Sequence, residues 1–317
     1  MCMRTYLLVN FGGPRNLDEI RPFLTELLQD QDVVRTRFPS WLHKPIFARA
    51  AKRRAVQVRE DYEAIGGKSP IYEDTEVLAQ KLSEKLKALV LTFHRYLPST
   101  HAQSLQAIEQ CSSSEILVIP CFPQFCYATT GSIARFLQNR LSTHTLHKLR
   151  WVHSYATHPA YIRAFQQRIR EMLPQSEVLL LFSAHGIPEA FVSTGDIYAT
   201  ECEQSFRAIA AGFPFAESRL CYQSKFGKGE WLKPYTNELC ASLGSGKPVV
   251  VVPLSFTSDH IETLFEIEEL YLPKIRAGGR TATRCPALNL EPYWVEALVE
   301  IAQTSPLTHT QMLVRPS

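Results

Sequence analysis

Four carboxylates recur at short intervals in residues 252–270, which read VPLSFTSDHIETLFEIEEL. They are Asp259, Glu262, Glu266 and Glu269, spaced by three, four and three residues. At about 100° per residue in an α-helix, these side chains fall within a sector of roughly 80°. Carboxylates clustered in this way hold one another's pKa values up and attract cations, so the stripe can accept protons or bind a metal ion. A capping box made by Asp259 and Glu262, with a solvated face behind it, is the structural alternative.

A histidine follows another apolar run. Residues 182–189 read FSAHGIPE, which places His185 after a predicted strand and before a glycine. Ligands of open α/β sheets bind beyond the carboxyl ends of the strands, so this imidazole is placed to accept a proton or bind a metal ion. A structural histidine with satisfied hydrogen bonds is the alternative. Among the other histidines, His260 alone has a comparable setting, inside the acidic segment.

Three other stretches carry weaker signals. Residues 51–54 (AKRR) form a basic cluster that suits either a solvated helix face or a carboxylate-bearing ligand. Residues 122–132 combine hydroxyls and a glycine before a predicted helix, but the chain contains neither GxGxxG nor GxxxxGK[ST], which argues against nucleotide binding. Trp231 lies in a glycine-rich segment of the kind that lines pockets. Cys121 and Cys126 form only a C-x4-C pair, a weak metal signal.

The composition is that of a globular protein with a substantial core. Of 317 residues, 45% are hydrophobic and 21% charged, and the net charge is +3. This mild excess of cations argues against a dedicated nucleic-acid binder, and it suits an anionic ligand or loose contact with an anionic membrane surface. The first residues lack the pattern of a signal peptide, and no apolar run approaches the ~18 residues of a membrane span. A cytoplasmic protein is therefore expected, with possible contact at the inner face of the membrane.

Strand-like and helical patterns alternate along the chain. Such alternation predicts an α/β fold with parallel sheets flanked by helices. The strings LLVNFGGP (7–14) and LLLFSAHGIP (179–188) resemble each other and suggest two similar halves. We expect an N-terminal domain over 1–155 and a C-terminal domain over 156–317, with packing of the last helix on the first domain left open. Residues 304–317 are expected to form a frayed tail.

Six strings together resemble the ferrochelatase family: LLVNFGGP, IGGKSPI, FPQFCYATTGS, FSAHGIPE, CYQSKFGKGEWLKPYT and FTSDHIETLFEIEEL. They occur in the family's order and span residues 5 to about 300. The resemblance implies two Rossmann-like, chelatase-type domains, each a four-stranded parallel sheet flanked by helices, with an active-site cleft between them. It implies a lyase that forms nitrogen–metal bonds by inserting Fe²⁺ into protoporphyrin IX, with release of two protons, in the last step of heme biosynthesis.

The resemblance also implies roles for individual residues. His185, Glu262 and Glu266 match catalytic positions, and His185 and Glu262 would also contact the metal ion. Positions that line the porphyrin pocket or face its propionates are matched by Phe11, Arg53, Arg54, Tyr62, Ser69, Arg95, Tyr96, Tyr127, Trp231, Asp259 and His260.

One departure concerns the [2Fe–2S] cluster that some ferrochelatases carry. No cysteine follows Cys285, and Tyr127 stands where the internal cluster cysteine is expected, with Cys126 one residue early. We expect no cluster and no permanently bound cofactor, with Fe²⁺ as a substrate, and we expect a monomer that binds no nucleic acid. The alternatives are a coproporphyrin III ferrochelatase, another tetrapyrrole chelatase, and a non-catalytic tetrapyrrole carrier. A carrier needs neither His185 nor Glu262, which argues against it.

Overall fold

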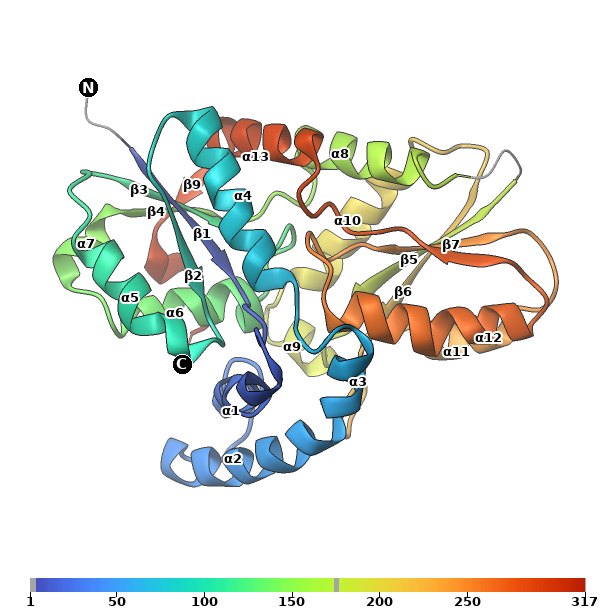
Figure 1. Ribbon diagram of the computed structural model, residues 1–317, viewed down its shortest axis with the longest axis horizontal. Coiled ribbons are helices and arrows are strands. Elements are labelled where there is room, and N and C mark those ends of the chain that lie inside the picture. Colours follow the sequence, from blue (N-terminus) through green and yellow to red (C-terminus); the bar gives the residue numbers. More distant parts are fainter. Residues whose placement is uncertain (1–3, 174–176, 317) are drawn as a thin grey trace. The chain divides into compact units, whose positions relative to one another are not determined.

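The computed structural model describes residues 4–173 and 177–316. The chain divides into two compact units, one formed by residues 1–154 and 298–317 and the other by residues 155–297 (Figure 1). The expected C-terminal domain, 156–317, differs from the second unit because residues 298–317 belong to the first. None of the described helices is both long and apolar enough to cross a membrane.

The first unit is built on a sheet in the order β2-β1-β3-β4-β9. Its first four strands are parallel, and the last pairs antiparallel with β4. The strands are β1 (Thr5–Asn10), β2 (Val90–His94), β3 (Ile116–Pro120), β4 (Leu149–Val152) and β9 (Leu307–Thr308). The expected four parallel strands are therefore present, and a short fifth strand extends the sheet.

Helices cover both faces of this sheet. The α-helices are α1 (Ile20–Gln29), α2 (Ser40–Gln57), α3 (Arg59–Ala64), α4 (Ile71–Leu86), α5 (Pro98–Glu109), α6 (Ser132–Gln138) and α7 (Thr143–Lys148), and α13 (Pro292–Thr304) crosses the boundary of the units. The short helices are η1 (Leu17–Glu19), η2 (Tyr127–Gly131) and η4 (Thr310–Met312). Figure 1 shows α5 and α6 on the opposite side of the sheet from α4.

The C-terminal tail is packed rather than frayed, so this expectation was wrong. Leu307 and Thr308 pair with β4, and Leu313 is fully buried in the core of the first unit. The indole N–H of Trp151 donates to the Thr310 hydroxyl at 3.0 Å. The tail stays ordered because it covers a large buried aromatic side chain and one edge of the sheet.

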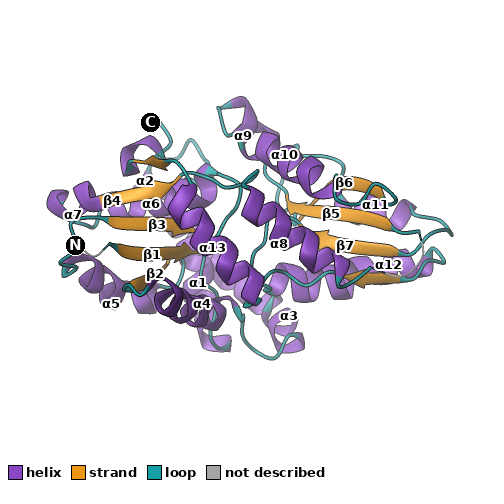
Figure 2. Cartoon of the chain, turned by 90° about the horizontal axis from the view of Figure 1, so that it is seen from above, coloured by secondary structure: helices purple, strands orange, loops and turns teal. Residues whose placement is uncertain are grey.

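The second unit holds a parallel sheet in the order β6-β5-β7-β8. Its strands are β5 (Leu179–His185), β6 (Glu217–Gln223), β7 (Val249–Pro253) and β8 (Ala282–Arg284). Its helices are α8 (Pro159–Arg170), α9 (Glu189–Ser193), α10 (Tyr198–Ala210), α11 (Thr236–Ser242), η3 (Glu262–Tyr271) and α12 (Leu272–Ala277). In Figure 2, α8, α10, α11 and α12 lie beside the strands, as expected for an α/β unit buried on both faces.

One face of the second sheet carries the helix of the acidic segment. Leu181 and Val251 on the strands pack in one buried cluster with Ile267 of η3 and Ile275 of α12. These apolar contacts fix η3 at the sheet, so the polar residues of η3 keep defined positions beyond the carboxyl ends of β5 and β7.

The acidic segment forms a π-helix over Glu262–Tyr271, where an α-helix was expected. A π-helix pairs residues i and i+5, so the 100° spacing does not apply. The four carboxylates therefore do not share one face. Asp259 is 7% exposed and precedes the helix, whereas Glu269 is exposed to solvent.

Candidate active site

His185 is the last residue of β5, and its backbone is held on both sides. Its N–H donates to Ser255 Oγ at 2.8 Å, and its carbonyl accepts from the Tyr198 hydroxyl at 2.9 Å. Ser255 follows β7 and Tyr198 begins α10. Two elements far apart in the sequence thus fix the end of the strand that carries the imidazole.

The ring of His185 has a defined tautomer in the neutral state. Its Nδ1 lies 2.5 Å from the Gly186 carbonyl oxygen, which can only accept, so Nδ1 carries the proton. Nε2 then keeps its lone pair and is able to accept a proton or bind a metal ion. Gly186 is needed here because an added Cβ would lie 2.9 Å from the Gln223 carbonyl oxygen.

Glu262 lies between two histidines. Its Oε2 is 3.7 Å from His185 Nε2 and 3.7 Å from His260 Nε2. These distances are too long for hydrogen bonds but allow electrostatic attraction. Among the described residues, this buried Oε2 has no hydrogen-bond partner, and neither has His260 Nδ1. A buried carboxylate oxygen without a donor is a position that a proton or a cation would satisfy.

The second histidine of this group is deeply placed. Burial lowers the pKa of the His260 imidazole, and the neighbouring carboxylates of Glu262 and Asp259 only partly oppose this effect. The ring of Phe256 packs against His260 with centroids 4.6 Å apart and lies 6.3 Å from the ring of His185. An apolar side chain therefore borders both imidazoles.

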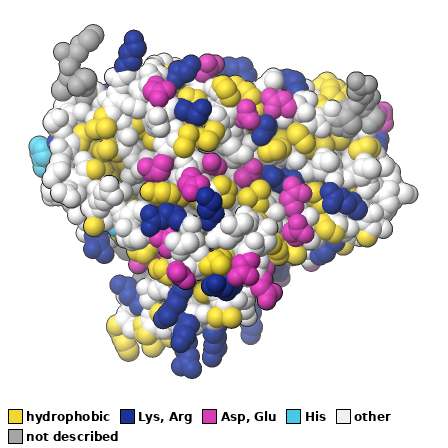
Figure 3. All heavy atoms as spheres, viewed as in Figure 1, with side chains coloured by type: hydrophobic (Ala, Val, Ile, Leu, Met, Phe, Trp, Pro, Cys, Tyr) yellow, Lys and Arg dark blue, Asp and Glu magenta, His cyan; other side chains and the backbone are white. Residues whose placement is uncertain are grey.

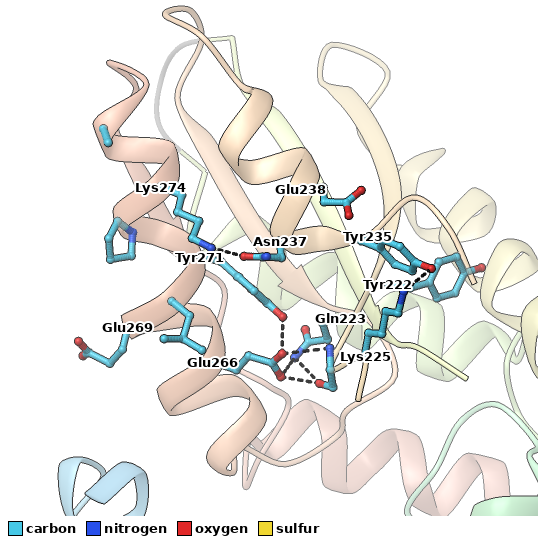
Figure 4. A pocket seen from close by; sticks show the side chains of 14 residues that line it. Tyr222, Gln223, Lys225, Tyr235, Asn237, Glu238, Glu266, Glu269, Tyr271 and Lys274 are labelled. Atoms are coloured by element: carbon cyan, nitrogen blue, oxygen red, sulfur yellow. Dashed lines mark hydrogen bonds between the residues drawn. The ribbon is translucent and has the colours of Figure 1, made fainter. Parts of the chain in front are cut away.

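Glu266 receives several hydrogen bonds (Figure 4). Its Oε1 accepts from the Ser224 N–H at 3.0 Å and from the Tyr271 hydroxyl. Its Oε2 accepts from Gln223 Nε2 at 3.2 Å and from the Ser224 hydroxyl. Burial, followed by the charge of Glu262, raises the pKa of Glu266, although hydrogen bonds from Ser224 and Tyr271 partly oppose the increase. This carboxyl is therefore suited to take up a proton closer to neutrality than an ordinary glutamate.

Gln223 links the parts of the site, and sequence reasoning missed it. Its Nε2 donates both to the Glu262 carbonyl oxygen at 2.9 Å and to Glu266, and its Oε1 accepts from Ser183 Oγ at 2.7 Å. It is 1% exposed and stands opposite His185 in the register of β5 and β6. The available signal was its position at the end of a strand, in the string CYQSKFG.

A pocket of about 710 Å³ in the second unit opens onto Glu266. Figure 4 shows the Tyr271 phenol pointing toward Glu266, with Lys274 and Glu269 farther along the same helical segment. Side chains from β6, α11, η3 and α12 line this pocket. Glu262 thus lies on the same helix as Glu266, and His185 lies on the sheet against which this helix packs. A solvent-accessible pocket lies beside Glu266.

Asp259 and Trp231 are placed differently from the catalytic candidates. Asp259 accepts from Arg284 Nη1 at 2.6 Å, from the Thr263 hydroxyl at 2.8 Å and from Asn289 Nδ2 at 2.8 Å. This buried ion pair anchors the start of the acidic segment. The contacts of Asp259 therefore indicate a structural role. Trp231 is 4% exposed, and its ring lies 5.1 Å from that of Phe226.

The expected porphyrin residues of the α2–α4 region include both exposed and buried groups. Arg53 and Arg54 are exposed on α2, and among the described residues Arg54 donates one long hydrogen bond, at 3.5 Å, to Gln57. Tyr62 and Ser69 are 4% and 3% exposed. The two arginines are therefore free to meet a ligand, whereas Tyr62 and Ser69 lie largely within the first unit.

Arg95 and Tyr96 belong to a buried network. Asp30 Oδ2 accepts from Arg95 Nη2 at 2.8 Å and from the Tyr96 hydroxyl at 2.9 Å. Tyr96 has no exposed surface. Phe11 packs edge-on against Tyr96 with ring centroids 4.5 Å apart. Tyr127, at the start of η2, packs edge-on against Phe125 at 5.1 Å.

The structure therefore groups the expected residues within each unit. His185, His260, Glu262 and Glu266 come together in the second unit, and Arg95 and Tyr96 come together in the first. Among the described residues, no cluster of three or more histidine, cysteine, aspartate or glutamate side chains is arranged to hold a resident metal ion.

Comparison with known proteins identifies the family. The ferrochelatase family profile matches residues 4–305. The chain belongs to the ferrochelatase family. A ferrochelatase of Chlamydia caviae is 46% identical over 316 residues, which cover 98% of each chain. A ferrochelatase of Chlamydia trachomatis serovar D is 45% identical over 310 residues, covering 96% of each chain.

Solved structures confirm the fold. SirB from Bacillus subtilis with Fe³⁺ has a TM-score of 0.54 at 10% identity, covering 95% of this chain and 96% of that chain. CbiX, described as the terminal enzyme for biosynthesis of siroheme in denitrifying bacteria, has a TM-score of 0.53 at 13% identity, covering 95% and 99%. The expected α/β chelatase fold with two parallel-sheet domains flanked by helices is thus confirmed.

Family membership also confirms the expected type of activity. The chain is a ferrochelatase-family enzyme, a lyase of heme and porphyrin biosynthesis that inserts iron into a porphyrin. The alternative of a non-catalytic carrier is therefore not supported.

Proposed function

We propose that this enzyme inserts Fe²⁺ into protoporphyrin IX, and that His185, Glu262 and Glu266 move the two protons that leave the pyrrole nitrogens. The observation that carries the proposal is the position of Glu262 Oε2, buried without a hydrogen-bond donor and 3.7 Å from each of two imidazole Nε2 atoms. A free-base porphyrin accepts a metal ion only after two N–H protons leave. A site for this reaction therefore needs both a proton acceptor and an anionic group near the metal ion.

His185 is the first proton acceptor in this proposal. Its Nδ1–H donates to the Gly186 carbonyl, which leaves Nε2 with a lone pair. A proton on Nε2 places an imidazolium 3.7 Å from the Glu262 carboxylate. Before Nε2 takes this proton, its lone pair and the Glu262 carboxylate are the nitrogen and oxygen donors that the incoming Fe²⁺ would meet in exchange for its waters.

Glu266 is the next proton acceptor. Its raised pKa makes it a better base than an ordinary glutamate near neutral pH. The pocket beside it gives protons a way to solvent. Gln223 holds the Glu262 backbone and the Glu266 carboxylate in one arrangement through its single amide nitrogen.

Arg53 and Arg54 are proposed to hold the porphyrin through its propionates. Both are exposed on α2, and a guanidinium forms charge-assisted hydrogen bonds with a carboxylate. Phe11, Tyr62, Ser69, Tyr127, Trp231 and His260 remain proposed porphyrin contacts. Arg95, Tyr96 and Asp259 belong to buried hydrogen-bond networks. These networks favour a role in supporting the site over direct contact with the porphyrin.

We also propose a cytoplasmic monomer that touches an anionic membrane surface through α2. Trp41 is 76% exposed, Phe38 is 47% exposed and Ile46 is 42% exposed near the start of this helix. Figure 3 shows lysine and arginine side chains gathered along the same region. Aromatic and apolar groups beside cationic ones suit the boundary between headgroups and acyl chains. We propose no [2Fe–2S] cluster, because Tyr127 stands where the internal cluster cysteine is expected.

A turnover assay with two porphyrins tests the substrate. Purified enzyme is mixed anaerobically with Fe²⁺ and either protoporphyrin IX or coproporphyrin III, and the loss of porphyrin fluorescence is followed. We expect a higher kcat/KM for protoporphyrin IX. A higher value for coproporphyrin III would assign the enzyme to the alternative substrate.

A further inference from the structure

A second pocket, of about 230 Å³, lies within the first unit and is lined mainly by charged side chains. Cations outnumber carboxylates in its lining, which contains Lys44, Arg95, Arg135 and Arg315 against Asp30 and Asp32. The pocket is formed by the end of α1, the segment between α1 and α2, the start of α2, and single residues of α6, the C-terminal tail and the loop after β2. None of these features has a part in the proton transfer proposed above.

The two carboxylates of this pocket already have their partners. Asp32 is 2% exposed, and its oxygens accept from Arg135 Nε at 2.6 Å and Arg315 Nε at 3.2 Å. Asp30 accepts from Arg95 Nη2 at 2.8 Å through Oδ2 and from the Asp32 N–H at 2.8 Å through Oδ1. Each arginine uses only part of its five-donor fork in these contacts, so N–H groups remain for another acceptor.

Two buried nitrogens at this pocket have no hydrogen-bond partner among the described residues. His43 is 0% exposed, and its Nδ1 is 2.9 Å from the Thr36 hydroxyl, while its Nε2 has no partner. Arg95 is 8% exposed, and its Nη1 has no hydrogen bond, with only Glu26 Oε2 3.5 Å away. When the Thr36 hydroxyl donates to Nδ1, His43 Nε2 carries a proton and becomes an unused donor. Buried donors in proteins are nearly always hydrogen-bonded, so an acceptor is expected to bind beside these two nitrogens.

The start of α2 adds to the positive electrostatic potential in this pocket. This 18-residue helix begins at Ser40 without a side-chain cap, and Ser40, His43 and Lys44 all line the pocket. The uncapped N–H groups and the dipole at a helix start favour an anion. Lys44 is exposed, and no carboxylate pairs with it among the residues that the structure describes.

We propose that this pocket binds a small oxyanion of the phosphate type. Its volume equals that of seven to eight waters at about 30 Å³ each, enough for a phosphate group with some of its hydration. Arginine forks match the geometry of phosphate oxygens, and the surplus of cations matches its charge. The ligand is either free inorganic phosphate or the phosphate group of an organic ester.

Calorimetric titration of the full chain with inorganic phosphate tests this proposal without porphyrin or iron, so its outcome does not depend on the proposed catalytic residues. We expect saturable binding, weakened about tenfold by Lys44→Gln and by His43→Phe, which keeps the ring packing on Phe47. The matched control is Lys52→Gln, which removes an exposed lysine from the same helix outside the pocket and should leave the affinity unchanged. Melting temperatures of all variants show whether they are folded.

A parallel titration with phenyl phosphate distinguishes the two sources. Tighter binding of inorganic phosphate identifies the free anion as the ligand, and tighter binding of phenyl phosphate identifies an ester. The proposal is overturned if neither compound binds saturably to the unaltered chain. It is also overturned if folded Lys44→Gln protein binds phosphate as tightly as the Lys52→Gln control.

Discussion

Tyr271 donates a hydrogen bond to the carboxylate of Glu266, five residues earlier in η3. In an α-helix, side chains five residues apart lie about 140° apart around the axis, at ~100° per residue. A π-helix stacks residues i and i+5, so the two side chains meet. The wider helix therefore brings a phenol to a carboxylate whose anionic form is disfavoured by burial and by the charge of Glu262.

Replacing this phenol should change the pH dependence of catalysis. The Tyr271 hydrogen bond lowers the pKa of Glu266, so Tyr271→Phe should raise that pKa further. We expect the acidic limb of kcat against pH to move toward higher pH. The control is Tyr235→Phe, because Tyr235 lines the same pocket but bonds to Lys225 instead. If the acidic limb of kcat against pH lies at the same pH in the Tyr271→Phe enzyme and in the control, Glu266 has no role in proton transfer.

The raised pKa of Glu266 also affects stability. The folded state keeps the Glu266 proton above the ordinary value of 4.5, whereas the unfolded state has lost it. The folded state then binds more protons, so this group lowers the free energy of unfolding as pH rises from 4.5 toward the folded-state pKa. Glu266→Gln should remove this decrease. The measurement is the difference in melting temperature between Glu266→Gln and the unaltered enzyme across pH 4 to about 8, and a constant difference would contradict the raised pKa.

His185→Ala should abolish insertion while porphyrin still binds. Loss of a positioned proton acceptor typically lowers the rate by about 10²–10⁴. Turnover is measured by fluorescence loss with Fe²⁺ present, and porphyrin binding by fluorescence without metal. His147→Ala, at an exposed histidine of α7, serves as the control. Turnover within about tenfold of the unaltered enzyme would remove His185 from the mechanism.

Several strands and the central chemistry could be predicted from the sequence. Apolar runs identified β1, β3, β5 and β7, because fully buried parallel strands are continuous in hydrophobicity. His185 stood out because it follows such a strand, and Glu262 because it recurs with other carboxylates at short spacing; the structure places His185 Nε2 3.7 Å from Glu262 Oε2.

Other features depended on contacts that the sequence does not display. Helices with i→i+5 hydrogen bonds are rare, so the acidic segment was predicted as an α-helix and its π-helix was missed. Gln223 and Ser224 act on Glu266 only because β6 lies next to β5, and their strand begins with exposed and half-buried residues. The tail resembled a frayed end because its apolar run of Met312 to Val314 is short, and among these three residues only Leu313 is fully buried.

Arg54→Ala should raise KM more than it lowers kcat. Arg54 is exposed and, among the described residues, interacts with the carboxylate of Asp61 through charge but forms no hydrogen bond to it, so its guanidinium donors are available to a propionate. A charge-assisted hydrogen bond contributes about 1.5–3 kcal/mol, which corresponds to a KM increase of roughly tenfold or more. Steady-state kinetics with varied porphyrin measures both constants, and Lys52→Ala on the same helix is the control. Equal losses in kcat and kcat/KM would instead indicate an interaction made only in the transition state.

Glu262→Gln separates the catalytic interpretation of the acidic segment from the structural one. In the catalytic interpretation, the carboxylate stabilises protonated His185 and meets the metal ion, so the amide should lower kcat severely. The melting temperature should hardly fall, because Glu262 Oε2 has no hydrogen-bond partner to lose among the described residues. In the capping-box interpretation, the free energy of unfolding would drop by about 0.5–2 kcal/mol and turnover would remain.

The structure favours the first outcome for the same Glu262→Gln protein. The side chain that would have formed the box, Asp259, is instead engaged with Arg284 and Thr263. Glu269→Gln is the matched control, since it removes an exposed carboxylate from the same helix and should change neither quantity much. Melting temperature and turnover are measured on each protein. Loss of stability with turnover retained would show that the segment serves the fold alone, and His185 would then lack its charged partner in the mechanism.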